Sequence, residues 1–80
     1  MRLEGIRYND GAGNAVVDIH VASTSELPTL GKALTDLGIA AKIMPTSIAC
    51  TKDGTFYKLH TDGKWYKQDG SGDSVTPSEG

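Results

Sequence analysis

The chain lacks most of the features that stabilise or identify a very small protein. It holds one cysteine, Cys50, so no disulfide can form within it, and its two histidines, His20 and His60, stand too far apart to give zinc-ligand spacing. A chain of 80 residues buries only about 60–65% of the surface that it exposes when unfolded, so its core is thin. We therefore expect no metal and no cofactor, and we expect oligomerisation or docking on a larger body to supply part of the stability.

Charge of one sign and long apolar runs are also missing. The formal net charge is −2, whereas a general nucleic-acid binder carries a basic surface. No apolar run reaches the roughly 18–20 residues that cross a bilayer, and residues 1–5 contain no signal-peptide core. Four lysines lie near aromatic residues, an arrangement that suits single-stranded nucleic acid but is equally typical of protected sheet edges; they are Lys52, Lys58, Lys64 and Lys67. We expect cytosolic synthesis, no membrane partner and no nucleic-acid partner.

The N-terminal part is typical of two strands joined by a turn. Residues 3–8 form a short strand-like run, and residues 9–14 (NDGAGN) tolerate positive φ. Residues 15–21 alternate with a period of two and are rich in β-branched side chains. The residues expected on the buried face are Ala15, Val17, Ile19 and Val21. The pattern predicts an N-terminal β-hairpin.

Residues 26–37 show the spacing of one helix face. Four leucines follow at steps of three, four and three residues: Leu27, Leu30, Leu34 and Leu37. Pro28 fits an early helical position and Gly38 suits the end, although Gly31 costs about 1 kcal/mol relative to alanine. We predict one short helix over 26–37, followed by a buried strand or an extended link at 39–44.

The segment 53–70 contains nearly the same six residues twice. DGTFYK at 53–58 returns as DGKWYK at 62–67, and each Asp-Gly stands between strand-like runs. This pattern is a strong hairpin signal. It predicts a C-terminal three-stranded antiparallel meander with strands at 47–51, 55–60 and 64–68.

The turn length fixes which side chains share a face of this meander. With three-residue turns, Leu59 lies opposite Trp65, and Tyr57 lies opposite both Ala49 and Lys67. One face then gathers Ala49, Tyr57, Leu59 and Trp65, and the other gathers Cys50, Phe56, Lys58, His60 and Tyr66. A two-residue second turn would pair His60 with Trp65 and exchange the faces. We favour the first register because it brings the bulky apolar groups together.

The last twelve residues differ in composition from the rest. Residues 69–80 (DGSGDSVTPSEG) hold three acids, no lysine or arginine, and one large apolar residue, Val75. Such a segment is expected to be disordered alone and to order only against a neighbouring protein. We therefore divide the chain into one β-rich domain, 1–68, and an extended acidic tail, 69–80.

Candidate catalytic groups are few. Cys50 and His60 are expected on one sheet face, where they resemble a nucleophile and its base, but no third residue completes the set. Asp18 and His20 share one face of a strand, which is typical of a solvated surface. Residues 11–13 (GAG) match a phosphate-binding loop only in composition. The sequence predicts that the chain is not an enzyme.

Part of the chain resembles small virion proteins of tailed bacteriophages that infect Gram-positive bacteria. Those proteins often carry Gly/Thr-Ser-Ile-Ala-Tyr, then Tyr-x-Leu, a turn and Gly-x-Trp. Here the pattern reads VASTSELP at 21–28, TSIAC at 46–50, FYKL at 56–59 and DGKW at 62–65. The match covers roughly residues 15–67, and Cys50 replaces the usual aromatic residue. The resemblance implies a non-enzymatic head-decoration or head-fibre component, made in the host bacterial cytoplasm and located in the virion.

A second resemblance is to the choline- or glucan-binding repeats of Gram-positive surface proteins. In those repeats Asp-Gly-x-Trp-Tyr-Tyr hairpins recur about every twenty residues, and residues 62–66 (DGKWY) match the pattern. The spacing of nine residues between the two Asp-Gly pairs does not match. The alternative function is thus a carbohydrate- or cell-wall-binding module.

The sequence predicts a mainly β fold of the α+β type that acts by adhesion. An aromatic sheet face is expected to bind other virion proteins, such as the capsid or an adjacent head or tail component, and further copies of the chain as a homo-oligomer. The residues expected to contact a partner are Tyr57, Leu59, Trp65, Tyr66 and Val75.

Overall fold

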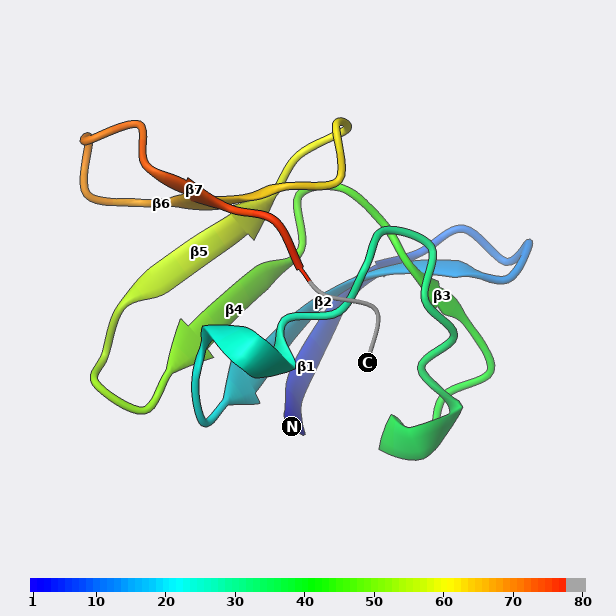
Figure 1. Cartoon of the computed structure of the whole chain (residues 1–80). Helices are drawn as coiled ribbons and strands as arrows, with labels where there is room; N and C mark the ends of the chain where they lie inside the picture. The colour runs from blue at the N-terminus through cyan, green and yellow to red at the C-terminus, as the bar shows by residue number, and fades with distance from the viewer. Residues whose placement is uncertain (78–80) are drawn as a thin grey trace.

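The computed structural model describes residues 1–77 and confirms a mainly β fold with a small helical content (Figure 1). The strands are β1 Arg2–Asn9, β2 Asn14–Val21, β3 Lys42–Ile43, β4 Ile48–Thr51, β5 Phe56–Leu59, β6 Trp65–Lys67 and β7 Ser74–Val75. Two 3-10 turns, η1 Thr24–Glu26 and η2 Thr35–Leu37, complete the elements. All seven strands belong to one sheet in the order β1-β2-β4-β5-β6-β7, with β3 also beside β2.

The N-terminal hairpin forms as predicted, and its buried alternation is confirmed. Ala15, Val17 and Val21 are fully buried on one face of β2. The pairing of β1 with β2 shifts register twice, between Leu3 and Gly5 and between Ile6 and Tyr8. Such bulges interrupt the regular ladder along an edge strand and so oppose further strand pairing there.

The helix predicted over 26–37 is wrong, because backbone groups of Gly31 and Leu34 bond to residues 41–43 and the segment keeps only short 3-10 turns. Gly31, at φ +80°, donates its N–H to the Ile43 carbonyl at 3.1 Å, and Leu34 donates to the Ala41 carbonyl at 2.8 Å. The left-handed glycine ends any helical path, and only the two 3-10 turns remain. Leu34 is buried, whereas Leu30 is 40% exposed, so the leucines do not form one helix face.

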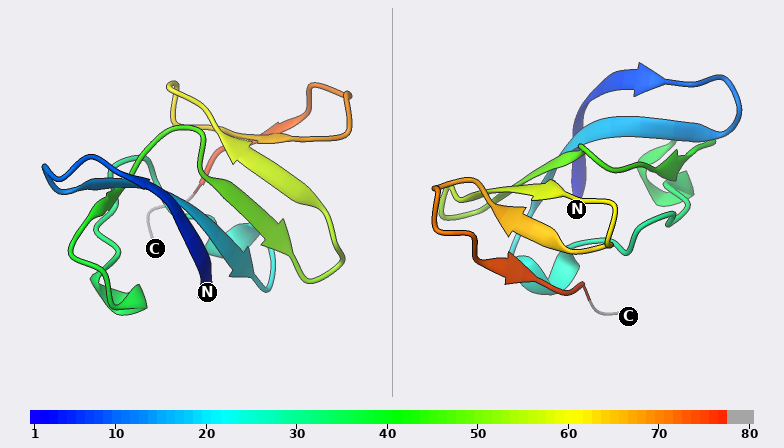
Figure 2. Two further views of the ribbon diagram at one scale, coloured as in Figure 1. Left: turned by 180° about the vertical axis from the view of Figure 1, so that it is seen from behind. Right: turned by 90° about the horizontal axis from the view of Figure 1, so that it is seen from above.

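Residues 22–41, which we call the cover segment, close one face of the sheet. The segment lies in front of the sheet in Figure 1 and behind it in the reversed view of Figure 2. Leu27 and Leu34 belong to the same buried cluster as the apolar face of β2. The protein therefore has two layers, an irregular cover and a twisted sheet, with the core between them.

β3 and β4 run parallel to β2 along the same edge, an arrangement that the sequence did not predict. β3 pairs with the first two residues of β2, and β4 pairs with the last four. Of the segment 39–44, which the sequence left open between strand and link, only Lys42–Ile43 forms a strand. The two short strands act as one interrupted strand whose break lies at residues 44–47.

Ser47 fills the gap in this interrupted strand. Its Oγ accepts the Val17 N–H at 3.1 Å and donates to the Met44 carbonyl at 2.8 Å, and the residue is fully buried. The neighbouring Thr46 has φ +76°, a left-handed conformation that is strained for a β-branched residue. The Arg7 guanidinium donates to the Thr46 carbonyl at 2.5 Å and helps to hold it there.

Replacing Ser47 by alanine is expected to lower the free energy of unfolding by about 1–3 kcal/mol, because the buried Val17 N–H loses its acceptor. Urea denaturation followed by circular dichroism measures the change. The exposed Ser74 supplies the control, and its alanine variant should change the value by less than about 0.5 kcal/mol. Equal, small effects of both substitutions would show that the side chain does not bridge β3 and β4.

The C-terminal meander has the register that three-residue turns predict. Ala49 pairs with Tyr57, Tyr57 with Lys67, and Leu59 with Trp65. Trp65 is fully buried, and its Nε1 donates to the Pro28 carbonyl of the cover segment at 2.8 Å. The meander is therefore fastened to the cover by its largest side chain.

The sequence analysis expected the tail to become ordered only against a neighbouring protein. In the structure, residues 74–75 instead pair with the sheet of the same chain. β7 pairs with β6, which places Val75 opposite Trp65, and Pro77 is buried. Val75 lacks apolar neighbours along the chain but packs against the core that the earlier strands build. Residues 78–80 of the predicted tail lie outside the described residues.

Four turns are closed in the same way by an aspartate that precedes a glycine. The carboxylates accept backbone N–H groups two residues ahead, as in Asx turns. The donors and distances are Ala12 to Asp10 at 2.8 Å, Thr55 to Asp53 at 3.1 Å, Lys64 to Asp62 at 2.9 Å, and Ser71 to Asp69 at 2.9 Å. In each case a side-chain hydrogen bond is the main cause that lowers the pKa of the carboxyl below 3.8; the donors are Asn14, Thr51, Tyr66 and Ser71 respectively.

This lowering predicts the pH dependence of stability. Because the folded-state pKa values lie below the unfolded value, the four carboxylates stabilise the fold fully above the unfolded pKa and lose that contribution as the pH falls through the folded values. The urea midpoint is expected to change little between about pH 7 and pH 5 and to decrease below about pH 3.8. A midpoint that stays level down to about pH 2.5 would contradict this role of the turn aspartates.

Candidate functional site

The sheet has one closed face and one open face. The cover segment closes the face that carries Val17, Ile19 and Trp65. We call the opposite side the outer face, and no element among residues 1–77 packs over it. It is formed by Glu4, Arg7, Asp18, His20, Ile48, Cys50, Phe56, Lys58 and Tyr66.

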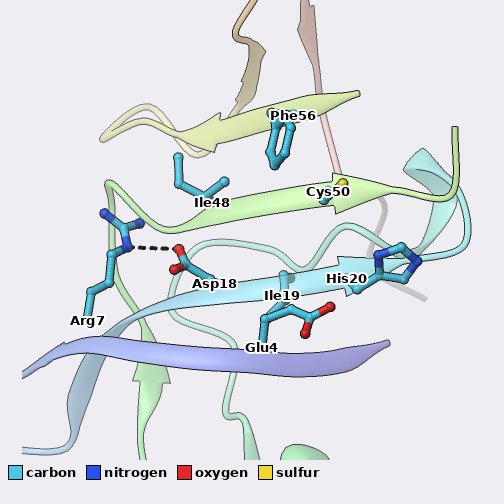
Figure 3. Close-up of a pocket in the computed structure, with 8 residues that line it drawn as sticks. All are labelled: Glu4, Arg7, Asp18, Ile19, His20, Ile48, Cys50 and Phe56. Carbon is cyan, nitrogen blue, oxygen red and sulfur yellow. Dashed lines mark hydrogen bonds and ion pairs between the residues drawn. The ribbon is translucent and has the colours of Figure 1, made fainter. Parts of the chain in front are cut away.

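A shallow groove of about 570 Å³ lies on the outer face, across β1, β2, β4 and β5 (Figure 3). Its floor is apolar because the strand pairing places β4 residues Ile48 and Cys50 beside Phe56 of β5. The parallel pairing of β2 with β4 brings Asp18 next to Ile48 and His20 next to Cys50. The groove therefore joins side chains from the two halves of the chain, and Phe56 at its rim is 54% exposed.

The acidic side chains of this outer-face groove are each paired with an arginine. Arg7 Nε donates to Asp18 Oδ1 at 2.8 Å, and Arg2 donates to Glu4 Oε1 at 2.8 Å. The Arg2 hydrogen bond, assisted by its charge, lowers the pKa of the Glu4 carboxyl. With these charges neutralised in pairs, the groove offers an apolar floor between polar walls, which suits a protein partner more than a strongly charged ligand.

The structure separates Cys50 from His60 along the sheet face that they share. Both come from the outer side of the sheet, but Cys50 lines the groove and its Sγ donates to the Thr51 carbonyl at 3.4 Å. His60 lines a separate hollow of about 240 Å³ and stacks on Tyr66 with 4.1 Å between the ring centres. The histidine beside Cys50 is His20, on β2. Within residues 1–77 no group of three or more His, Cys, Asp or Glu side chains is arranged to hold a metal ion.

Most of the residues predicted to bind a partner are inside the protein. Tyr57, Leu59 and Trp65 are buried under the cover segment, so they hold the fold together and are not available to a partner of the folded chain. Val75 is half-buried against the same core, and Tyr66 is half-buried on the outer face. The prediction assumed that the meander face with the largest apolar side chains would be exposed. The sequence did not show that residues 22–41 would cover this face.

The residues that sequence reasoning missed come mainly from β1, β2 and β4. Phe56 was placed on the correct face but was not chosen, although an aromatic residue facing away from the core is a usable signal. Ile48 was not placed on either face. Ile6 and Tyr8 of β1 are 46% and 55% exposed and extend the apolar surface of the hairpin.

Comparison with protein-family models, curated proteins and solved structures finds no match to this chain. Within the described residues, no helix has the length and apolar character needed to span a membrane.

Proposed function

We propose that the chain is a non-enzymatic structural component of a bacteriophage particle, of the head-decoration or head-fibre group. In this role it binds other virion proteins through the outer face of its sheet. It is made in the cytoplasm of the bacterial host, it is incorporated into the virion, and it acts there as a homo-oligomer.

The observation that carries this proposal is the contrast between the two sheet faces. One face is closed by the chain's own cover segment, whereas the other leaves Phe56 at 54% exposure beside an apolar groove. Exposed aromatic side chains surrounded by neutralised polar groups are typical anchors of protein interfaces. Burying Phe56 against a partner would also add apolar contact to a chain whose own core is thin.

The assignment to a virion rests on the resemblance in residues 46–50, 56–59 and 62–65. In the structure this pattern supplies Ser47, which lies between β3 and β4 and bonds Val17, and the core residues Leu59 and Trp65. The shared pattern is therefore one that builds the meander, and it supports a similar meander in the bacteriophage proteins that carry it.

The alternative, a cell-wall-binding module, would need aromatic side chains open to a sugar. Trp65 is fully buried and its Nε1 is already bonded to Pro28, so it does not stack on a ligand in the folded chain. Tyr66 and His60 stack on each other beside it, and Tyr66 uses its hydroxyl to bond Asp62 at 2.6 Å.

Mass spectrometry of purified bacteriophage particles tests the proposal. Particles released from the strain that encodes the chain are purified by density gradient, washed in high salt and digested with trypsin. We expect peptides of this chain in a fixed ratio to the major capsid protein. Particles without the chain, together with its retention on choline resin or isolated cell walls, would overturn the virion assignment and favour the alternative.

A further inference from the structure

Four Asp-Gly pairs occupy the turns of this small protein, and each is a potential site of a spontaneous backbone modification. In such a pair the glycine nitrogen attacks the aspartate Cγ, and water leaves as a five-membered succinimide closes. Water then opens the ring at either carbonyl and restores aspartate or leaves isoaspartate, with no change in composition and no oxidant or reductant. Glycine favours the reaction because it has no side chain to block the attack.

Three of the four aspartates are held by at least two different residues. Asp10 accepts N–H groups from Ala12 and Asn14. Asp62 accepts the Lys64 N–H at 2.9 Å and the Tyr66 hydroxyl at 2.6 Å.

Asp53 is restrained in the same way. It accepts the Thr55 N–H at 3.1 Å and a hydrogen bond from the Thr51 hydroxyl. In all three turns, rotating the carboxylate toward the glycine nitrogen breaks hydrogen bonds to two different residues.

Asp69 is restrained less. Its only hydrogen-bonding neighbour within the described residues is Ser71, through Oδ1 at 2.9 Å, and Oδ2 faces Lys67 Nζ at 3.8 Å, beyond hydrogen-bond distance. The Asp69 side chain is 49% exposed. Gly70 and Gly72 both have positive φ, so this loop, like the one at Asp10, has two residues whose missing side chains leave the backbone less restricted.

The strand that follows this loop is also the shortest of the strands that flank the four Asp-Gly turns. β7 has two residues and pairs only with β6, whereas the turns at Asp53 and Asp62 lie between longer strands of the meander. Fraying of two residues exposes few contacts and therefore costs little free energy. The loop at 68–73 can thus reach the geometry of ring closure without unfolding the sheet.

We propose that Asp69-Gly70 is the site at which this chain forms isoaspartate, and that the modification releases β7 from the sheet. Isoaspartate inserts one extra methylene into the backbone of the loop and moves the free carboxylate from the side-chain position that bonds Ser71 to the α-carbon. Both changes shift the register that holds Val75 opposite Trp65. The loss of β7 uncovers the tryptophan, which the intact chain buries fully.

The chain offers a direct test because trypsin separates the four Asp-Gly pairs into four different peptides. Cleavage after Arg7, Lys32, Lys52, Lys58, Lys64 and Lys67 yields residues 8–32, 53–58, 59–64 and 68–80, each with one pair. The folded protein is aged at about 37 °C near neutral pH, digested, and the aspartyl and isoaspartyl forms of each peptide are separated by chromatography and quantified.

We expect isoaspartate to accumulate first in peptide 68–80, at roughly tenfold the rate of the other three, a ratio that corresponds to about 1.4 kcal/mol of barrier. The Asp69→Glu variant, which cannot close a five-membered ring, should remove the signal, while the matched Asp53→Glu variant should leave it unchanged. The aged fraction should show acrylamide quenching of Trp65 that the fresh protein lacks. Equal rates at all four pairs, or a modified fraction whose Trp65 stays shielded, would overturn the proposal.

Discussion

Replacing Trp65 by alanine is expected to lower the free energy of unfolding by about 3–5 kcal/mol, the range for removing a fully buried large aromatic side chain. The side chain lies opposite Leu59 on β5 and Val75 on β7, and its Nε1 bonds the Pro28 carbonyl. Its loss therefore opens a cavity, detaches the cover segment and leaves a buried carbonyl without a donor. A domain of this size has a total stability of roughly 4–12 kcal/mol, so the variant should be close to unfolded at room temperature.

The neighbouring Tyr66 supplies the control for this prediction. Its side chain points to the outer face, where it stacks on His60 and bonds Asp62. Its alanine variant should cost about 1 kcal/mol, the usual value for one exposed aromatic pair and one hydrogen bond. Urea denaturation followed by circular dichroism measures both variants, and a Trp65→Ala loss no larger than the Tyr66→Ala loss would contradict the assigned core.

The Leu34→Ala variant is expected to lower the free energy of unfolding by about 2–5 kcal/mol, whereas Leu30→Ala should change it by less than about 0.5 kcal/mol. Both belong to the cover segment, but Leu34 is fully buried in the core and Leu30 is 40% exposed. An α-helix over 26–37 would place both leucines on one face and predict losses of similar size. The pair of variants therefore distinguishes the irregular cover from the helix that the leucine spacing indicates.

Equal, large losses for Leu34→Ala and Leu30→Ala would contradict the cover segment as described. Far-ultraviolet circular dichroism gives a second reading, because a twelve-residue helix would add a clear minimum near 222 nm, typical of α-helices, that two 3-10 turns do not give. Leu37 is half-buried, so the Leu37→Ala variant should lower the free energy of unfolding by an amount between those of Leu30→Ala and Leu34→Ala.

The parts of the fold that the sequence predicts are those that local chemistry decides. The alternation in residues 15–21 and the Asp-Gly turns of the meander act over a few residues, so the β2 faces and the register of Leu59 with Trp65 followed from them. The leucine spacing failed to predict the structure because Gly31 adopts positive φ and the backbone around it bonds to Ile43 of β3. Leucines at this spacing can also be buried by a segment without an α-helix, as Leu27 and Leu34 are here.

The parts that could not be predicted depend on pairing between distant residues. The parallel alignment of β4 with β2 depends on Ser47 reaching Val17, thirty positions away. β7 pairs with β6 and lies with Val75 opposite Trp65, a contact that the composition of the tail does not reveal. For the candidate site, the sequence assigned Phe56 to the correct face but could not show which face the cover would close.

The central claim is that one sheet face folds the chain and the other binds virion proteins. Its most direct test is the amount of chain retained on purified particles when Phe56→Lys, on the outer face, is compared with Leu30→Lys, another exposed apolar position, on the cover segment. Both variants should keep the wild-type urea midpoint. The account predicts that Leu30→Lys stays on the particles, while Phe56→Lys is reduced roughly tenfold, as expected for loss of an interface anchor worth about 1.4 kcal/mol. Folded Phe56→Lys protein that remains on the particles at the wild-type level would contradict it.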